Sequence, residues 1–284
     1  MSRKISFKGN PMTLAGRTMK IGAVARDFRV ISKDLKEVSL KDFNGKTKII
    51  TTFPSLDTPV CDLQVKEFNK RAVDISKDVI VLAISKDLPF AQGRFCETFG
   101  INNIKVLSDY KTSSFGINYG LVIKELNLLA RSAIILDRNN VLRYVQIVGE
   151  LTEHPDYEDV LNNLKDVIKD HAPAPKENLP GHCVPCEKGA PPLPKEKSKE
   201  LLAALAGWQL IDDKKIAKEF KFGDFSDAKY FLDIISVIAE EQGHHPDMAL
   251  LYNKLKIELT THSAGGLTKN DFVMAKMIDE INAD

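Results

Sequence analysis

The sequence of 284 residues has no long apolar stretch, and none of its segments approaches the roughly 18 residues that a membrane-spanning helix requires. The residues after Met1 form no apolar signal-peptide core. The net charge is only +1 at pH 7, so the chain has no surplus of either sign for binding nucleic acid or a charged membrane surface. These absences predict a cytoplasmic protein that binds neither nucleic acid nor a membrane.

Cysteine is also scarce, since the chain has only four. Four cysteines are too few for a disulfide framework in a protein of this size, and a reducing compartment would make any disulfide transient and catalytic. The residues around each cysteine in the sequence are therefore used to infer whether it is catalytic or structural.

Proline is distributed unevenly: seven of the 13 prolines lie between Pro173 and Pro194, among Lys, Glu and Gly. Such density predicts an extended segment with little regular structure. The chain length suits two domains, each large enough to bury a core. We expect a first domain over residues 1–170, a proline-rich linker over 171–194 and a second domain over 195–284.

The first domain alternates strand and helix patterns after an opening hairpin, and it ends with an antiparallel pair and a helix. This order predicts an α/β fold of three layers, of the thioredoxin type. The expected elements are a strand at 48–53, a helix around Cys61, a strand at 79–84, a helix at 89–99, a strand at 105–107, a helix near Ser114, strands at 132–136 and 141–148, and a helix at 155–168.

Cys61 follows a loop that starts at Pro54, directly after an apolar strand. Leu63 and Phe68 are spaced as on one apolar helix face, which places Cys61 in the first turn of a helix. Free amide groups and the positive end of the helix dipole favour a thiolate there. Thr58, three residues earlier, can turn its hydroxyl towards the sulfur. The alternative is that Cys61 is an inert core residue.

The pattern Pro54-x-x-x-Thr58-x-x-Cys61 resembles the peroxiredoxin signature, in particular that of the bacterial thiol peroxidases, and the resemblance extends from about Ile5 to Ile168. It includes the segments around Cys96 and Arg131. The resemblance implies that Cys61 is the peroxidatic thiolate, that Cys96 is the resolving thiol and that Thr58 and Arg131 hold the thiolate and the peroxide at a site that includes Pro54. It also implies thioredoxin as the reductant. Position alone would make Arg131 a solvated charge at a strand edge.

The implied chemistry is consistent with these residue types. Attack on a peroxide develops negative charge on the departing oxygen, which a guanidinium and a hydroxyl stabilise. It leaves Cys61 as a sulfenic acid that a second thiol protects from overoxidation. If Cys61 and Cys96 lie in separate helices, one helix must unwind before a disulfide forms. Gly93 lowers the stability of the helix that carries Cys96 and would ease this opening.

The second domain is predicted to be a small α+β fold. Its helix at 225–241 has an apolar stripe that includes Phe225, Leu232 and Ile235, and Gly243 is placed to end it. The other expected elements are a helix at 195–204, strands at 208–211, 215–220, 248–252 and 254–261, and a helix at 268–281.

The histidines of this domain carry the second resemblance. The pattern Glu240-x-x-x-His244-His245-Pro246, followed by Tyr252, His262 and Asp271, resembles the signature of pterin-4a-carbinolamine dehydratases. Imidazoles can act as acid and base near neutral pH, as dehydration of a carbinolamine requires. The resemblance implies that the site residues are the catalytic His244, His245 and His262 with Glu240, Tyr252 and Asp271 contacting the pterin.

Other interpretations of these residues remain open. The histidines could bind zinc, but adjacent histidines in an extended segment point opposite ways and no carboxylate has the right spacing, so we expect neither a metal nor a cofactor. Asp271 with Thr268 also fits a capping box, which we favour. His262 is expected to point away from the core.

Cys183 and Cys186 form a C-x-x-C motif without the strand, helix or second ligand pair that would define it. It is either an incidental feature or an internal reductant for a disulfide between Cys61 and Cys96. Substitution of both by Ser tests the second possibility, because loss of peroxide turnover without added thioredoxin would support it.

Taken together, the sequence predicts a bifunctional enzyme. One activity is the thioredoxin-dependent reduction of hydrogen peroxide and organic hydroperoxides, and the other is the dehydration of 4a-hydroxytetrahydropterin to quinonoid dihydropterin. The alternative is a redox sensor joined to a non-catalytic dimerisation or regulatory module. We expect a homo-oligomer in either case.

Overall fold

A computed structural model describes residues 3–72, 78–170, 182–184 and 191–282 of the chain. The chain divides into two units, Met1–Lys176 and Glu177–Asp284. Most of the segment predicted as a linker, at 171–181 and 185–190, lies outside the described residues. Within the part of the chain that is described, no helix is long and apolar enough to cross a membrane.

The first unit is built on a seven-stranded sheet. Its two central pairings, β5 (Thr47–Thr52) with β6 (Val79–Ser85) and β6 with β7 (Lys105–Ser108), are parallel, and the outer pairings are antiparallel. The strand order across the sheet is β11 (Leu142–Ile147), β10 (Ser132–Leu136), β5, β6, β7, β3 (Arg29–Ile31) and β4 (Glu37–Ser39).

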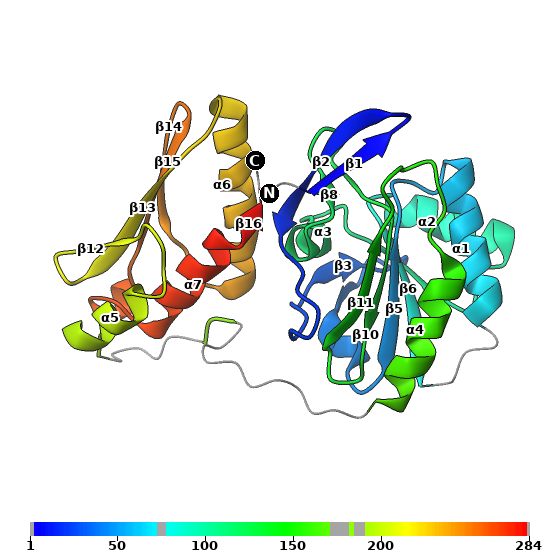
Figure 1. Cartoon of the computed structure of the whole chain (residues 1–284), viewed down its shortest axis with the longest axis horizontal. Coiled ribbons are helices and arrows are strands. Elements are labelled where there is room, and N and C mark those ends of the chain that lie inside the picture. The colour runs from blue at the N-terminus through cyan, green and yellow to red at the C-terminus, as the bar shows by residue number, and fades with distance from the viewer. Residues whose placement is uncertain (1–2, 73–77, 171–181, 185–190, 283–284) are drawn as a thin grey trace. The chain divides into compact units, whose positions relative to one another are not determined.

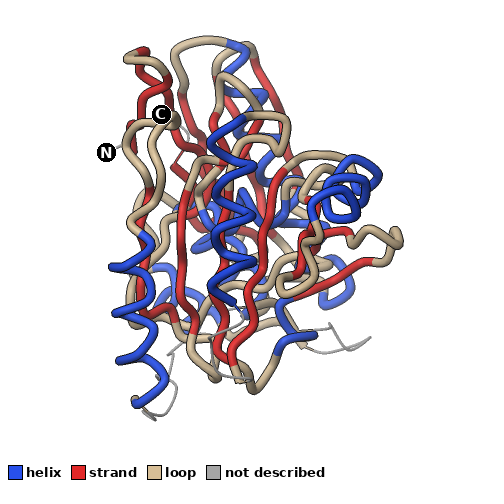
Figure 2. The backbone as a smooth tube through the Cα atoms, turned by 90° about the vertical axis from the view of Figure 1, so that its right-hand side faces the viewer, coloured by secondary structure: helices blue, strands red, loops and turns tan. Residues whose placement is uncertain are grey.

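Helices lie on both sides of this sheet (Figure 1). On one side, α1 (Pro59–Arg71), α2 (Pro89–Phe99) and α4 (Tyr157–Lys169) cover the core, and Figure 2 looks onto this helix-covered side. The short α3 (Ser114–Tyr119) packs on the other side against β2 (Asn10–Arg17) and β3. A 3-10 turn, η1 (Leu40–Phe43), follows β4. These three layers confirm the predicted thioredoxin-like fold.

The opening hairpin belongs to a second, smaller sheet. Its strands pair in the order β1 (Arg3–Phe7), β2 (Asn10–Arg17), β8 (Val122–Ile123) and β9 (Leu128–Leu129). The sequence pattern indicated the hairpin but not β8 and β9, because two-residue strands give no measurable alternation.

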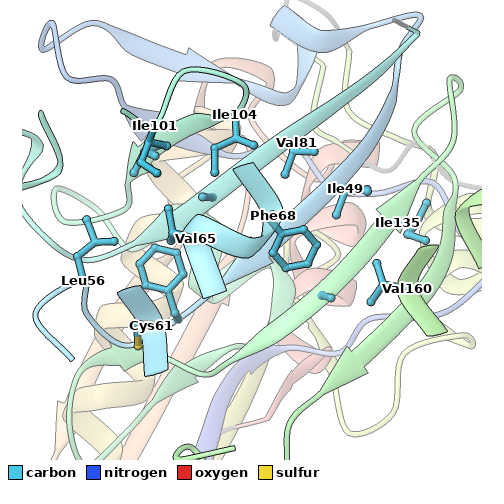
Figure 3. Close-up of a cluster of buried hydrophobic side chains, with 14 of the residues drawn as sticks. Ile49, Leu56, Cys61, Val65, Phe68, Val81, Ile101, Ile104, Ile135 and Val160 are labelled. Atoms are coloured by element: carbon cyan, nitrogen blue, oxygen red, sulfur yellow. The ribbon is translucent and has the colours of Figure 1, made fainter. Parts of the chain in front are cut away.

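The core of the first unit places Cys61 at the start of α1, on the helix face that also carries Val65 and Phe68 (Figure 3). These side chains pack against Ile49 of β5 and other apolar residues of the sheet. The apolar face predicted through Leu63 was wrong, because Leu63 is 53% exposed. The buried face instead follows the spacing 61, 65, 68, which is closer to the helical period.

The second unit is an α+β fold with a four-stranded antiparallel sheet, as predicted. Its strand order is β12 (Gln209–Ile211), β13 (Lys215–Lys221), β15 (Lys254–Leu259) and β14 (Asp247–Leu251). The remaining elements are α5 (Lys195–Leu202), α6 (Phe225–Gln242), the 3-10 turn η3 (His262–Ala264), α7 (Lys269–Asp279) and β16 (Ile281–Asn282).

Helix α6 ends as predicted at Gly243, which adopts a left-handed φ of 60° and donates its N–H to the Ala239 carbonyl. Its buried face overlaps the predicted stripe only in part. Ile235 is buried as predicted, but Phe225 is 48% exposed, and the buried Phe231 and Ile234 are absent from the predicted stripe. The buried face is wider than the predicted stripe because both sides of this helix carry apolar residues.

Candidate functional sites

The loop before α1 delivers Cys61 into the first turn of the helix. Strand β5 ends at Thr52, Thr58 is the N-cap of α1 and Pro59 opens the helix. Helix α1 has Cys61 in its first turn, as predicted. The Cys61 side chain is fully buried. The free amides of that turn and the dipole of α1 therefore act on this sulfur.

The Thr58 hydroxyl contacts the sulfur directly. Its oxygen lies 2.8 Å from Cys61 Sγ and 3.1 Å from the Ser55 carbonyl oxygen. A hydroxyl has one proton, so it donates to the sulfur or to the carbonyl but not to both at once. Thr58 itself is exposed, which places it between the buried sulfur and solvent.

Arg131, which directly precedes β10, supplies a cation to the same sulfur. Its Nη2 lies 3.3 Å from Cys61 Sγ. Two of its nitrogens, Nε and Nη2, donate to the Leu151 carbonyl at 3.2 and 2.8 Å. The interpretation of Arg131 as a solvated edge charge was wrong, because the residue is 1% exposed. A buried guanidinium held by a backbone carbonyl is a fixed charge beside the sulfur.

Cys96 lies near the end of α2, a separate helix, and is half-buried against the same core as Cys61. Both are free thiols. Burial raises the pKa of the Cys96 thiol, opposed by the charge of Lys33. Pro54, the first residue of the loop, is half-buried. Thus one sulfur has a cation and a hydroxyl beside it, and the other lies in surroundings that favour a neutral thiol.

His154 lies near Arg131, although the sequence gave it no role. Its Nδ1 is 3.0 Å from the Tyr157 hydroxyl. Burial and the charge of Arg131 lower the pKa of His154. This shift favours the neutral form of the imidazole.

In the second unit, His244 follows α6 and points inward. Its Nε2 lies 2.9 Å from Asp271 Oδ1, and both side chains are buried. The other carboxylate oxygen accepts from the Thr268 amide at 2.7 Å and the Thr261 hydroxyl at 2.9 Å. Thr268 and Asp271 form the predicted capping box of α7. Asp271 is fully buried, and both of its carboxylate oxygens have hydrogen-bond partners, one of which is His244.

His245 points the opposite way, as predicted for adjacent residues in an extended segment. It is exposed, and its Nε2 lies 3.1 Å from Oε1 of Glu240, which is also exposed. The pair therefore forms a solvent-facing acid and base at the end of α6.

His262 belongs to η3 and not to the end of a strand, because β15 ends at Leu259. Its side chain is 77% exposed, and its Nε2 lies 3.9 Å from Asp247 Oδ2. Asp247 and His262 line one shallow pocket together with Ile211, Asp212, Lys214, Lys215, Thr260 and Gly265. His244 and His245 are not among the residues that line this pocket.

Tyr252 lies outside the strand that was predicted to end with it. It does not end a strand but lies in the turn between β14 and β15, with a left-handed φ of 52° and 70% exposure. Leu251 pairs with Lys254 beside this turn, whereas Asp247 pairs with Glu258 at the opposite end of the hairpin. Tyr252 follows one end of β14, and His262 lies near Asp247 at the other end. Because the five residues of β14 span about 17 Å, Tyr252 and His262 are far apart within the chain.

Comparison with known proteins identifies both units. Residues 20–161 match the family model of redoxins. The chain belongs to the redoxin family. Its first unit is similar to the thiol peroxidase of Bacillus subtilis (strain 168), with 47% identity over 166 residues that cover 58% of this chain and 99% of that protein. The thiol peroxidase of Halalkalibacterium halodurans is also 47% identical, over 164 residues that cover 58% of this chain and 98% of that protein.

A solved structure supports the same assignment. The crystal structure of a peroxiredoxin-like protein from Aquifex aeolicus superposes with a TM-score of 0.55 at 40% identity, covering 59% of this chain and 98% of that one. Residues 191–281 match the family model of pterin 4 alpha carbinolamine dehydratases. The chain is therefore a redoxin domain fused to a pterin dehydratase domain, and both predicted family resemblances are confirmed.

The redoxin domain also has a buried residue that the sequence reasoning missed. Gln64 is fully buried, and its Oε1 accepts from Arg131 Nη1. Its Nε2 donates to the Thr51 hydroxyl at 2.5 Å and the Thr52 carbonyl at 3.2 Å. The amide thereby ties the guanidinium to the end of β5. The signal was present in the sequence, because Gln64 lies on the helix face of Cys61 and Phe68.

A second missed residue of the redoxin domain is Asp87, which follows β6. Its Oδ1 accepts from the Ser55 hydroxyl at 2.6 Å, and its Oδ2 accepts from the Leu56 amide at 2.8 Å. Oδ2 also accepts from the Ser85 hydroxyl at 2.7 Å. The carboxylate therefore fixes the loop that leads to Cys61. A lone Asp in a loop carries no spacing pattern that would have predicted this.

Cys183 is buried against the dehydratase domain. Its amide donates to Gln242 Oε1 at 2.8 Å, and Val184 exchanges two hydrogen bonds with the Asn270 side chain. Cys186 lies outside the described residues, so the C-x-x-C motif stays a prediction. Among the residues that the structure describes, no three His, Cys, Asp or Glu side chains are placed to hold a metal ion.

Proposed function

We propose that the redoxin domain reduces hydrogen peroxide and organic hydroperoxides through Cys61, with thioredoxin as the reductant. The observation that carries this proposal is the pair of contacts on one buried sulfur, from the Thr58 hydroxyl at 2.8 Å and from Arg131 at 3.3 Å. A purely structural cysteine has no need of a buried cation, whose desolvation is unfavourable.

The arrangement supports attack of the Cys61 thiolate on a peroxide O–O bond. The sulfur takes one oxygen and becomes a sulfenic acid, and the other oxygen leaves as an alkoxide or hydroxide that takes up a proton. Arg131 and Thr58 lie where that negative charge develops, so they stabilise the transition state more than the bound peroxide. Gln64 and the Leu151 carbonyl hold the guanidinium in place beforehand.

Cys96 completes the cycle in this proposal. Its thiol attacks the sulfenic sulfur, the S–O bond breaks and water leaves with the thiol proton. The product is a Cys61–Cys96 disulfide, which thioredoxin reduces by thiol–disulfide exchange. Because the two sulfurs start in separate helices, α1 or α2 must open locally first.

Mass spectrometry after addition of one equivalent of peroxide tests this pairing. The expected product is an intramolecular disulfide between Cys61 and Cys96, whereas Cys96→Ser should accumulate sulfenic and sulfinic acid at Cys61. Rapid turnover with thioredoxin supports a peroxidase. Slow turnover with oxidation of an added partner protein would instead support a redox sensor.

We propose that the second domain dehydrates 4a-hydroxytetrahydropterin to quinonoid dihydropterin, with acid and base roles shared by His244, His245 and His262. The supporting observation is the buried pair of His244 and Asp271 at 2.9 Å. Asp271 accepts the Nε2 proton of neutral His244, which leaves Nδ1 as an acceptor for a substrate proton. The exposed His245 and His262 are reachable by a pterin.

A double substitution of His244 and His262 by Ala tests catalysis separately from assembly. We expect loss of dehydration with an unchanged oligomeric state by sedimentation. Retained dehydration would overturn the catalytic proposal and leave a dimerisation or regulatory module. Comparison with the Glu240→Ala variant shows whether the exposed pair of His245 and Glu240 contributes to dehydration.

We also propose the domain bounds 1–170, 171–194 and 195–284, and the formation of a homo-oligomer.

A further inference from the structure

One lysine connects the two helices that carry the reactive cysteines. Lys66 lies on α1, and its Nζ is 2.6 Å from the carboxylate of Asp62, the residue after Cys61. The same Nζ lies 3.5 Å from the ring centroid of Phe99 on α2 and 5.9 Å from that of Phe95. A single ammonium group thus bridges an acidic side chain on one helix and an aromatic pair on the other.

The aromatic pair flanks Cys96 in sequence and lies on the same helix. The rings of Phe95 and Phe99 are 4.9 Å apart. Phe99 is nevertheless 47% exposed, so the core holds it only in part. The contact with Lys66 therefore adds to what holds the end of α2, because a cation over a ring face is attracted by the ring quadrupole.

The sequence of α2 also includes a residue that weakens the helix. Gly93 lies inside the helix, and a methyl group at that position would meet only the Lys33 side chain, at 4.0 Å. Packing therefore does not require a glycine there, and its effect is to weaken the helix by roughly 1 kcal/mol relative to Ala. Gly100 ends the helix in a left-handed conformation with a φ of 63°.

We propose that Lys66 is a latch that holds α2 folded and thereby sets the rate at which Cys96 reaches oxidised Cys61. The inference rests on the proposed Cys61/Cys96 chemistry. In the step concerned, the Cys96 sulfur bonds to the sulfenic sulfur of Cys61, the S–O bond breaks and water leaves. The latch acts before that step, since the contacts of Lys66 with Phe95 and Phe99 are lost when the end of α2 unwinds.

Burial of Cys96 is consistent with this order of events. In the folded helix, burial raises the pKa of its thiol. Unwinding of α2 removes that burial, so the thiolate needed for attack forms more readily in the open state. A tight latch would keep Cys61 as a sulfenic acid for longer and expose it to a second peroxide.

The test compares Lys66→Gln, Lys66→Arg and Phe99→Leu with Lys70→Gln, a control one turn later on the exposed side of α1. Reactions of the full chain with peroxide are quenched in acid over time, and mass spectrometry quantifies sulfenic acid, disulfide and sulfinic acid. Because the one Trp, Trp208, lies in the other unit, a chemical readout is preferable to fluorescence.

Loss of the contact in Lys66→Gln or Phe99→Leu should speed disulfide formation by roughly two- to five-fold, the factor for one partly exposed cation–π contact. The sulfinic fraction at a given peroxide concentration should fall by a similar factor. Lys66→Arg should retain the wild-type rate because it retains the cation, and Lys70→Gln should match the wild type. The rate of the first step, Cys61 oxidation, should be unchanged in all four.

Unchanged or slower disulfide formation in both Lys66→Gln and Phe99→Leu would overturn the latch. A wild-type chain that oxidises but never joins Cys61 to Cys96 would overturn the proposed resolving step and the latch together. A disulfide that forms at one rate in every variant overturns the latch alone, so the two failures are distinguishable.

Discussion

The two proposed sites differ in how far the chain has already organised them. In the redoxin domain, Cys61, Gln64 and Arg131 are all at most 1% exposed, and Arg131 contacts both of the others. In the dehydratase domain His244 and Asp271 are buried, while His245 and His262 have side chains 60% and 77% exposed. One site is a closed network, and the other is a set of separate groups.

This difference corresponds to the chemistry proposed for each domain. Peroxide cleavage develops charge on a small oxygen group, and a fixed cation in surroundings of low dielectric stabilises it best. Dehydration of a pterin moves protons to and from a large, polar ring, which exposed imidazoles can reach. The more preorganised site is therefore the peroxide site, whose reacting group is small and offers the protein few contacts for binding.

The largest effect should come from removing the nucleophile of the closed site. Cys61→Ser is expected to reduce peroxide turnover to the uncatalysed background, because no other described thiol has a cation and a hydroxyl beside it. Dehydration of the pterin should be unaffected. The check is both assays on the same preparation, and a simultaneous loss of dehydration would show that the two domains are not independent.

Arg131→Ala should follow, with a decrease of about 10²- to 10³-fold in the rate of Cys61 oxidation, the range for loss of one charge-stabilising donor. Arg131→Lys should recover only part of it, since an ammonium cannot contact Cys61, Gln64 and Leu151 at once. Stopped-flow measurement of oxidation gives the rate, and urea unfolding gives stability. A rate decrease that merely tracks lost stability would argue against a direct role.

The sequence predicted the closed site better than the open one, for a physical reason. Pro54, Thr58 and Cys61 lie in one short loop and one helical turn, so local spacing fixes their geometry. Gln64 and Asp87 escaped prediction because a polar side chain in a helix or loop is usually solvated, and only the folded chain shows that these two meet a buried partner.

The second site depends on how a hairpin is paired, which spacing alone does not determine. Tyr252 and His262 are both near β15, yet the antiparallel pairing places them at opposite ends of the hairpin. The β–α order was predictable from periodicity, whereas the last two strands of the sheet, β3 and β4, have three residues each and were too short to detect.

Asp271→Asn probes the one preorganised pair of the open site, and a smaller effect is expected there. An amide can still accept from His244, but it weakens the interaction that fixes the imidazole, so dehydration should decrease by about 10-fold, one order below the Arg131 effect. Loss of the capping box should lower the free energy of unfolding by about 1 kcal/mol. Asp247→Asn, near exposed His262, is the matched control. An equal decrease in both variants would remove the distinction between buried and exposed histidines.

The last effect concerns stability and not turnover. It involves another buried cation of the redoxin domain, Lys48, which is fully buried and bonded to Asn140. Burial lowers the pKa of Lys48 to about 8, against the opposing charge of Asp137. The unfolded chain therefore binds more protons than the folded chain above about pH 8. The free energy of unfolding is lower at neutral pH and rises as the pH approaches the pKa of the unfolded chain.

Lys48→Met should remove this pH dependence. The difference in free energy of unfolding between wild type and variant, from urea titrations at pH 7 to 10, should shift in favour of the wild type by roughly 1 to 3 kcal/mol as the pH rises. Taking the difference cancels groups that titrate equally in both proteins. A flat difference would mean that Lys48 keeps its proton throughout this pH range and that its hydrogen bonds hold a permanent charge inside the domain.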